Sequence, residues 1–369
     1  MKEMQKRIIT LAVASLLTGT AFAQSNVTVY GIIDVGYGYY GDAAADNTKS
    51  KSAIDAGQWK TSRIGFKGSE DLGNGVTANF QAEFKNPVDT ADTLTARNSF
   101  VGLKSATLGE IRIGSVNSFH DNLLNATSGV FEFAGISQPT KVYIETTGSK
   151  ETTDLKNAVA YYSPVWSGFQ FKLGASTHAD TGSDDVTPTG VTPTTGNERV
   201  YTAAIHYANG PLIAGATYET NEYQSFHNAP DIDSGSEYHL AAAYDFGIVR
   251  VNGAYGQTSY AQNTAAEHRD TRKQWLLGAS TPIGAKGVLA ASYAHATLSY
   301  DNASDDTSSF WGIGYLHALS KRTRLYAAYG DINQDKDNTY KSRFEGGISN
   351  KATDAVYQTA FNVGIRHDF

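Results

Sequence analysis

Several short motifs contain the residue types of nucleotide and calcium sites, and each can be tested against the spacing that such a site requires. Residues 36–41, GYGYYG, fit the glycine fingerprint of dinucleotide-binding proteins. That fingerprint needs a helix directly after it, so that the helix N-terminus faces a pyrophosphate. The polar stretch 42–52 follows instead. We therefore expect no nucleotide site.

The remaining candidates for a chemical site also fail on spacing. Residues 331–335, DINQD, begin like a calcium loop, but Lys336 stands where glycine is needed and Ser342 where a bidentate glutamate is needed. The nine histidines show no metal-site spacing. Several histidines lie within predicted strands, among them His206, His239 and His295. No nucleophile motif supports a hydrolase, although serine and histidine both occur in predicted strands. The sequence thus predicts no cofactor and no metal.

The elements that would position functional side chains have a period of two. In residues 76–85, VTANFQAEFK, the apolar side chains alternate with polar ones, as they do in an extended strand. Residues 63–67 alternate in the same way, and the SEDLGNG run between them supplies turn residues. The pattern predicts a hairpin with one apolar and one charged face. The apolar face would point inward in a soluble sandwich and outward, towards lipid, in a membrane barrel.

The N-terminus indicates export. A basic head, a short apolar run and the small-residue site Ala21-Phe22-Ala23 are typical of a secretory signal peptide over residues 1–23. Its removal would leave 346 residues with a formal charge of −9, which argues against nucleic acid as a partner. The chain has no cysteine, so an exported form would be stabilised without disulfides. No later segment has the ~20 apolar residues of a membrane helix.

The rest of the chain, residues 24–369, predicts a single all-β domain. We count about sixteen alternating segments joined in turn by tight turns and long polar loops, the asymmetry of a transmembrane antiparallel β-barrel. Residues 41–57 are interpreted as the first such loop. Alternation stops over 117–156, where several apolar residues remain, and so long an irregular segment is usually functional. No linker divides the chain, which favours a membrane barrel over a large soluble sandwich.

Five segments resemble the general porins of Gram-negative bacteria, in particular the branch of Neisseria, Bordetella and Burkholderia. They are SNVTVYGIIDVGYGYY, SRIGFKGSEDLGNGVTANFQAEF, RNSFVGLKSATLGEIRIG, NAVAYYSPVWSGFQF and the terminal FNVGIRHDF. The resemblance implies a homotrimer of sixteen-stranded barrels in the outer membrane. It also implies that the third long loop, about residues 117–155, folds into the lumen as a constriction.

Resemblance and strand parity together give the expected site residues. Arg63 and Arg97 match arginines of the family's barrel wall, and parity points both inward. The expected basic residues of the constriction are Arg63, Arg97, Arg112 and Lys156, and the expected acidic residues are Asp121 and Glu132. Inward positions elsewhere give the expected pore-lining residues Asp34, Glu83 and Lys85. The chain departs from many relatives at Ser115 and Asp154, where arginine is common. Phe369 resembles the family's C-terminal assembly signal.

The function expected on this basis is a passive, water-filled channel for ions and small hydrophilic solutes. Two alternatives remain: a substrate-selective channel with an aromatic track, for which Tyr30, Tyr162 and Tyr326 are candidates, and an outer-membrane hydrolase. The expected partners are the other subunits of a homotrimer, outer-membrane lipid and lipopolysaccharide, the barrel assembly machinery, and the solutes and ions themselves.

Overall fold

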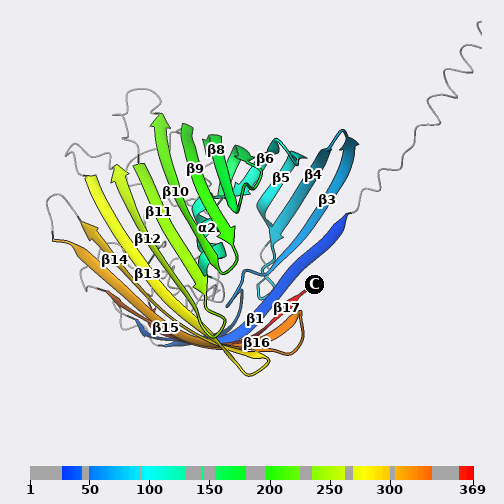
Figure 1. Cartoon of the computed structure of the whole chain (residues 1–369). Coiled ribbons are helices and arrows are strands. Elements are labelled where there is room, and N and C mark those ends of the chain that lie inside the picture. The colour runs from blue at the N-terminus through cyan, green and yellow to red at the C-terminus, as the bar shows by residue number, and fades with distance from the viewer. Residues whose placement is uncertain are drawn as a thin grey trace, which may run out of the picture.

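The chain forms one closed antiparallel sheet (Figure 1). The computed structural model describes residues 27–43, 50–90, 93–128, 143, 154–179, 197–224, 235–261, 269–299, 304–334 and 357–369. The predicted signal peptide and Glu132 lie outside the described residues. None of the helices in the described part is long and apolar enough to cross a membrane.

Alternating apolar and polar residues form the strands as the period of two predicts. The strands are β1 (Thr28–Ala43), β2 (Lys51–Ala56), β3 (Arg63–Gly73), β4 (Val76–Lys85), β5 (Thr95–Ser105), β6 (Gly109–Asn117), β7 (Asp154–Tyr162), β8 (Phe169–Ala179), β9 (Asn197–Asn209), β10 (Leu212–Gln224), β11 (Gly235–Asp245), β12 (Arg250–Ala261), β13 (Arg269–Ile283), β14 (Gly287–Ser299), β15 (Asp306–Ala318), β16 (Thr323–Gln334) and β17 (Tyr357–Asp368).

Two of the strands share one place in the barrel. β2 pairs with residues 35–40 of β1, and β3 pairs with residues 28–32 of the same strand. The strands of the described part therefore fill sixteen positions, which confirms the predicted number. Pairing of β1 with β17 closes the sheet, so no strand edge remains to attract another chain. The prediction of a loop over 41–57 was wrong in part, because β2 lies within it.

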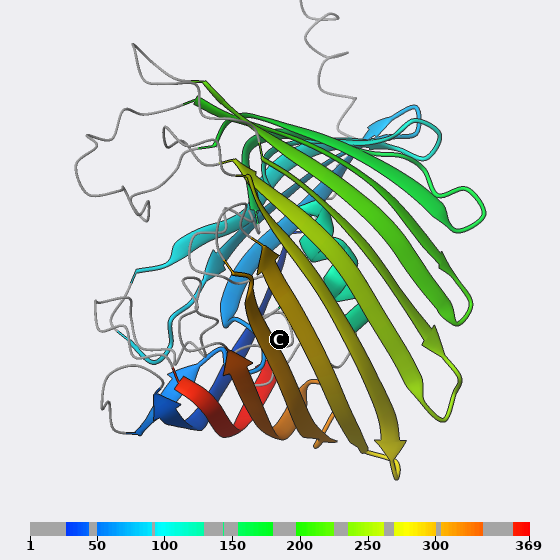
Figure 2. The ribbon, with the colours of Figure 1, turned by 90° about the vertical axis from the view of Figure 1, so that its left-hand side faces the viewer.

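Short turns and long connections alternate around the barrel (Figure 2). Asn74, with a φ of 53°, and its two glycine neighbours turn the chain between β3 and β4, a conformation that asparagine and glycine adopt at low cost. β3 runs to Gly73, so this turn is tighter than the predicted SEDLGNG turn. The start of β1 and the end of β17 lie at the end of the barrel that carries these short turns.

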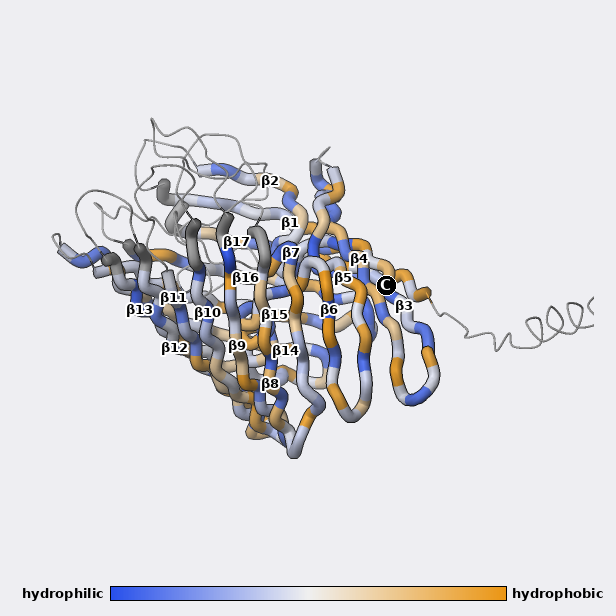
Figure 3. The backbone as a smooth tube through the Cα atoms, turned by 90° about the horizontal axis from the view of Figure 1, so that it is seen from above, coloured by the Kyte–Doolittle hydropathy of each residue, from blue (hydrophilic) through white to orange (hydrophobic). Residues whose placement is uncertain are grey.

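The outside of the barrel is apolar and the inside is polar, the reverse of a soluble protein. Hydrophobic and hydrophilic residues follow one another along the strands (Figure 3). On β5 the outward Val101 is 65% exposed. On β13 the outward Leu277 is 57% exposed, whereas the inward Gln274, three residues before it, is fully buried. Large buried side chains on the inner face include Asp34, Glu83, Glu237, Arg272 and Asn362. The parity assigned to β4 from the sequence is therefore confirmed. On β5 the argument that parity points Arg97 inward was wrong, because Arg97 shares the parity of the outward Val101, and it is the irregularity between Ser99 and Ala96 that turns it towards Glu83.

One helix, α2 (Phe119–Ser128), follows β6 and was not predicted. Ser118 caps its N-terminus by accepting a hydrogen bond from the backbone N–H of Asp121 at 3.3 Å. Phe119, Leu123 and Leu124 form an apolar face that is buried. This face contacts β9 to β12, and α2 is drawn on the concave side of those strands in Figure 1.

Candidate functional site

Two arginines bind one carboxylate, and a lysine follows on the same strand, where β3, β4 and β5 lie side by side. Glu83, on β4, is 6% exposed. Its Oε1 lies 3.0 Å from Nε of Arg97 and 3.4 Å from Nη1 of Arg63. Its Oε2 accepts a hydrogen bond of 3.0 Å from the hydroxyl of Tyr30. Lys85 is the direct cross-strand neighbour of Arg63 and is exposed. The group therefore carries a surplus of positive charge.

A change of register brings the two arginines together. β4 and β5 pair regularly up to Ala82 and Ser99, and an irregularity follows before Phe84 pairs with Ala96. Such a bulge turns a side chain away from the regular alternation, and here Arg97 reaches Glu83 on the next strand. Arg63 is the first residue of β3, and its Nε donates to the carbonyl of Thr61 at 3.0 Å.

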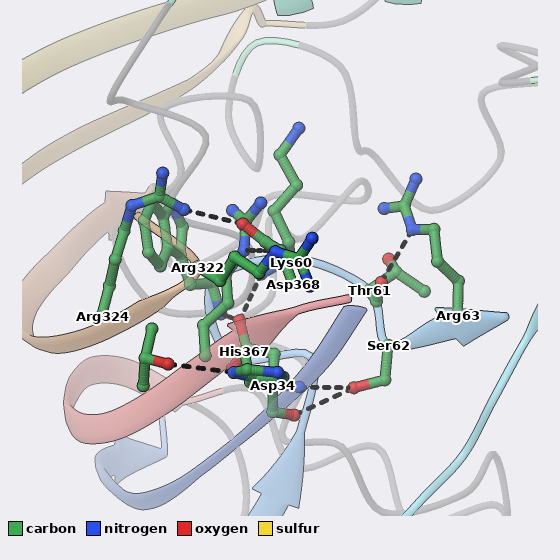
Figure 4. A network of polar contacts seen from close by, with 12 residues as sticks. Asp34, Lys60, Thr61, Ser62, Arg63, Arg322, Arg324, His367 and Asp368 are labelled. Carbon is green, nitrogen blue, oxygen red and sulfur yellow. Dashed lines mark hydrogen bonds and ion pairs between the residues drawn. The ribbon is translucent and has the colours of Figure 1, made fainter. Parts of the chain in front are cut away.

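A second cationic group lies on the adjacent strands β16 and β17. Arg324 and Arg366 are direct cross-strand neighbours. Both bind Asp368: Nη1 of Arg324 lies 2.8 Å from Oδ2, and Nε of Arg366 lies 2.7 Å from Oδ1 (Figure 4). Like charges directly opposite each other on a sheet repel, so a shared carboxylate between them lowers the electrostatic cost.

The two groups are joined through β1. Arg366 pairs with Asp34 and Arg63 pairs with Ile32, so the two arginines flank β1 on either side. Neighbouring strands lie about 4.8 Å apart, which puts their backbones on the order of 10 Å from each other. The inner wall from β16 to β5 is thus one basic sector, which we call the arginine sector and define by Arg63, Lys85, Arg97, Arg324 and Arg366.

A short inward segment, residues 57–62, covers part of this sector. The buried carboxylate of Asp34 holds it, since Oδ2 accepts the backbone N–H of Trp59 at 3.1 Å and of Lys60 at 2.7 Å. Oδ1 accepts the hydroxyl of Tyr326 at 2.6 Å. Ser62 bonds to the backbone N–H and C=O of Asp34, both at 3.0 Å (Figure 4). Asp34 therefore fixes the backbone of residues 57–62, and this segment in turn covers the carboxylate of Asp34.

The indole of Trp59 lies over the arginine sector. It contacts the ring of Tyr326 edge-on, with centroids 5.8 Å apart. The guanidinium carbons of Arg366 and Arg324 lie 4.5 Å and 5.9 Å from the indole centroid. Planar guanidinium groups stack well on aromatic faces. The indole therefore orients these two cations in addition to the carboxylate of Asp368.

The α2 segment contributes the acidic side chains that the structure describes. Asp121 lies in the first turn of α2, where a carboxylate is favoured, and accepts a hydrogen bond from Asn117 at 3.2 Å. Asp154 begins β7 opposite Asn117, and the charges of Arg97, Asp121 and Glu83 all act on it.

At the other end of α2, Nη2 of Arg250 donates to the carbonyls of Ala126 and Thr127 at 3.1 Å and 3.0 Å. Burial lowers the pKa of His120, also on α2, below its ordinary value.

Other expected site residues lie elsewhere. Arg112 pairs with Gly102, five residues along β5 from Arg97. It binds Glu110 at 2.6 Å and packs between the rings of Phe100 and Tyr162, each 4.4 Å away. The structure does not bring it to Glu83.

The last two expected residues are Lys156, on β7, and Phe369, directly after β17. Lys156 is exposed on β7, next to a bulge at Asn157. Phe369 pairs with Gly31 through two backbone hydrogen bonds of 3.0 Å and 3.1 Å. Its ring lies over the same glycine, where a Cβ would come within 2.8 Å of the ring's Cε1.

Several cationic residues of the inner wall were missed from the sequence. Lys172 on β8 is 7% exposed, and its Nζ lies 3.2 Å from Nδ1 of His206. Parity could have found it, because it lies between the outward Phe171 and Leu173. Parity could also have found Arg366, which follows the outward Ile365.

Comparisons with known proteins agree with this geometry. The family model described as Gram-negative porin matches residues 10–337. Outer membrane porin protein 32 of Delftia acidovorans is 30% identical, with 99% of this chain and all of that protein covered. A major outer membrane protein P.IB of Neisseria gonorrhoeae is 26% identical with the same coverage. The solved structure titled anion-selective porin from Comamonas acidovorans is 27% identical and covers 94% of this chain and all of its own, with a TM-score of 0.73.

A closed antiparallel barrel with an apolar outer face and a charged inner wall defines the class of outer-membrane channels. This chain belongs to the Gram-negative porin family. It is a porin channel for small solutes in the outer membrane of a Gram-negative bacterium, and its family and fold indicate a channel rather than an enzyme.

Proposed function

We propose that the channel is passive and water-filled, that it narrows between the arginine sector and the segment containing α2, and that it prefers anions. The observation that carries the proposal is a repeated ratio of charges. Arg63 and Arg97 share Glu83, and Arg324 and Arg366 share Asp368. Among these ion pairs the cations outnumber the carboxylates two to one in each group.

These cations can act on solutes because the wall residues are partly accessible. The side chains of Arg97 and Arg324 are 24% and 32% exposed. Charges are screened strongly only beyond about 8–10 Å at ordinary salt, so an ion passing a narrow zone feels them. The solved relative titled anion-selective supports the same preference.

The α2 segment supports the proposed narrowing. Its apolar face packs against β9 to β12, while Asp121 on the same helix and Asp154 just after the segment carry negative charge. Glu132 belongs to the same proposal from the sequence alone. Cations on one wall and carboxylates on the opposing segment would produce a field across the lumen.

Assembly is part of the proposal. We infer a homotrimer whose outer surface contacts lipid and lipopolysaccharide, and recognition of Phe369 by the barrel assembly machinery. Phe369 supports this, because it ends the last strand with its ring 41% exposed. The mass of the protein in detergent tests the trimer. The amount of Phe369→Ala protein that is assembled in the outer membrane, in cells with the machinery intact, tests the assembly signal.

Reconstitution tests the passive channel. In planar bilayers the single-channel conductance should rise in proportion to salt concentration. Swelling of liposomes should slow steadily with the size of the sugar and should not saturate. Saturation with one sugar would instead indicate a substrate-selective channel.

A further inference from the structure

Three buried side chains with metal-binding atoms meet between α2 and the barrel wall. His120 comes from α2, and Glu237 and His239 come from one face of β11. Their ligand atoms all lie within 4.8 Å of one another. Nδ1 of His120 lies 3.3 Å from Oε1 of Glu237, and Nε2 of His239 lies 3.6 Å from its Oε2.

Several polar atoms of this cluster make no hydrogen bond within the described part of the chain. His120 is 2% exposed, yet neither of its ring nitrogens makes a hydrogen bond there, and the same holds for Nε2 of His239. The two imidazole rings stack with centroids 5.2 Å apart. Buried polar atoms normally have a partner, and an exception needs an explanation such as an ion.

The surroundings orient the rings in the way that a metal site requires. The hydroxyl of the buried Tyr143 lies 3.1 Å from Nδ1 of His239. If Nδ1 donates its proton to that oxygen, Nε2 carries the free lone pair and faces Glu237, as in metal sites whose histidines are held from behind. Gly256, opposite His239 on β12, leaves room for both groups, since a Cβ there would lie 2.9 Å from the Tyr143 hydroxyl.

We propose that His120, Glu237 and His239 bind a divalent transition metal of the zinc type, with water as the fourth ligand. Two imidazoles and a carboxylate suit zinc and its neighbours, whereas calcium and magnesium prefer oxygen ligands. Zinc bonds of about 2.0–2.1 Å in a tetrahedron separate ligand atoms by roughly 3.3 Å. The two histidine nitrogens lie 3.3 Å and 3.6 Å from different oxygens of Glu237, so a single bound oxygen would reach both distances after a rotation of the carboxylate.

The charge around the cluster is compatible with a dication. Glu219 is the direct cross-strand neighbour of Glu237 and is also buried, which adds a second carboxylate. The charge of Arg272 also acts on Glu237. A bound metal would join α2 to β11 through three ligands, two of which come from the wall.

The test uses refolded, tag-free, full-length protein in detergent. Cobalt is added as a spectroscopic probe, and zinc is then titrated to displace it. We expect the visible absorption of tetrahedral cobalt at one equivalent per chain, and its loss on addition of zinc. His120→Gln and His239→Gln should each weaken zinc binding at least tenfold. His295→Gln, which removes a histidine of β14, should leave binding unchanged.

Three results would overturn the proposal: a cobalt spectrum that stays octahedral in the wild type, an unchanged affinity in His120→Gln, or an equal loss in His295→Gln. The wild-type spectrum alone decides the matter if a β11 variant does not fold. The readout is independent of conductance, so it separates this site from the proposed channel properties.

Discussion

Arg324 and Arg366 lie directly opposite each other on β16 and β17, and both guanidinium groups bind the carboxylate of Asp368. The arrangement is stable because the carboxylate offers one oxygen to each arginine and the indole of Trp59 faces both. Two cations thus share one carboxylate, and Arg366 also lies directly opposite the buried Asp34. The same ratio at Arg63, Arg97 and Glu83 makes the inner wall from β16 to β5 a continuous basic surface.

Asp34 and Tyr326 connect the first and last parts of the barrel, and their hydrogen bond can be measured. Tyr326→Phe removes a hydrogen bond to a buried carboxylate, which should lower the free energy of unfolding by about 1.5–3 kcal/mol. Urea unfolding in lipid vesicles measures the change. Tyr315→Phe, at an exposed position on the neighbouring strand, should change it by less than about 0.5 kcal/mol. Equal effects of the two changes would contradict the role given to Asp34.

The outward face of β4 provides a test of the membrane assignment. Phe80→Asp places a charge against lipid near the middle of a strand and should destabilise the barrel by at least about 2 kcal/mol. Gln81→Asp is the matched control, because its side chain faces the lumen beside Lys67. Refolding yield into vesicles should fall only for the first. Asn79 is a poor control, since it donates a hydrogen bond to Glu110 at 2.8 Å.

Arg250 should hold α2 in place. Its guanidinium closes the C-terminal end of α2 by binding two carbonyls, where a cation is favoured. Arg250→Ala should remove about 1 kcal/mol of local stability and increase the fluctuations of the single-channel current. Lys286→Ala, in the turn between β13 and β14, should leave the current unchanged. A quiet Arg250→Ala channel would show that α2 does not depend on this contact.

The sequence was sufficient for the barrel because each strand carries its own alternation. The outward positions of β4, the number of strands and the order of turns and loops all depend on local pattern and chain length. Arg63 and Glu83 were found in the same way, since parity alone puts them on the polar face.

The inward segment at 57–62 could not be predicted, because its partners are distant in the chain. Asp34 and Tyr326 are 292 residues apart and meet only when β17 pairs with both β1 and β16. The cluster of His120, Glu237 and His239 was missed for a similar reason. A helix and a strand separated by more than a hundred residues supply it, so no local spacing indicates a metal site.

The arginine sector should make the channel prefer anions. The zero-current potential across a planar bilayer in a potassium chloride gradient measures this preference directly. The wild type should show the sign of an anion-selective pore. Arg63→Gln together with Arg97→Gln should shift the potential towards cations. A unit charge 8 Å from a passing ion in water contributes about 0.5 kcal/mol, or roughly twofold in permeability ratio per charge.

Lys286→Gln together with Lys321→Gln removes the same charge from exposed turns and should leave the potential unchanged. A cation-selective wild type, or a potential that moves equally in both double variants, would contradict an anion preference caused by the arginine sector.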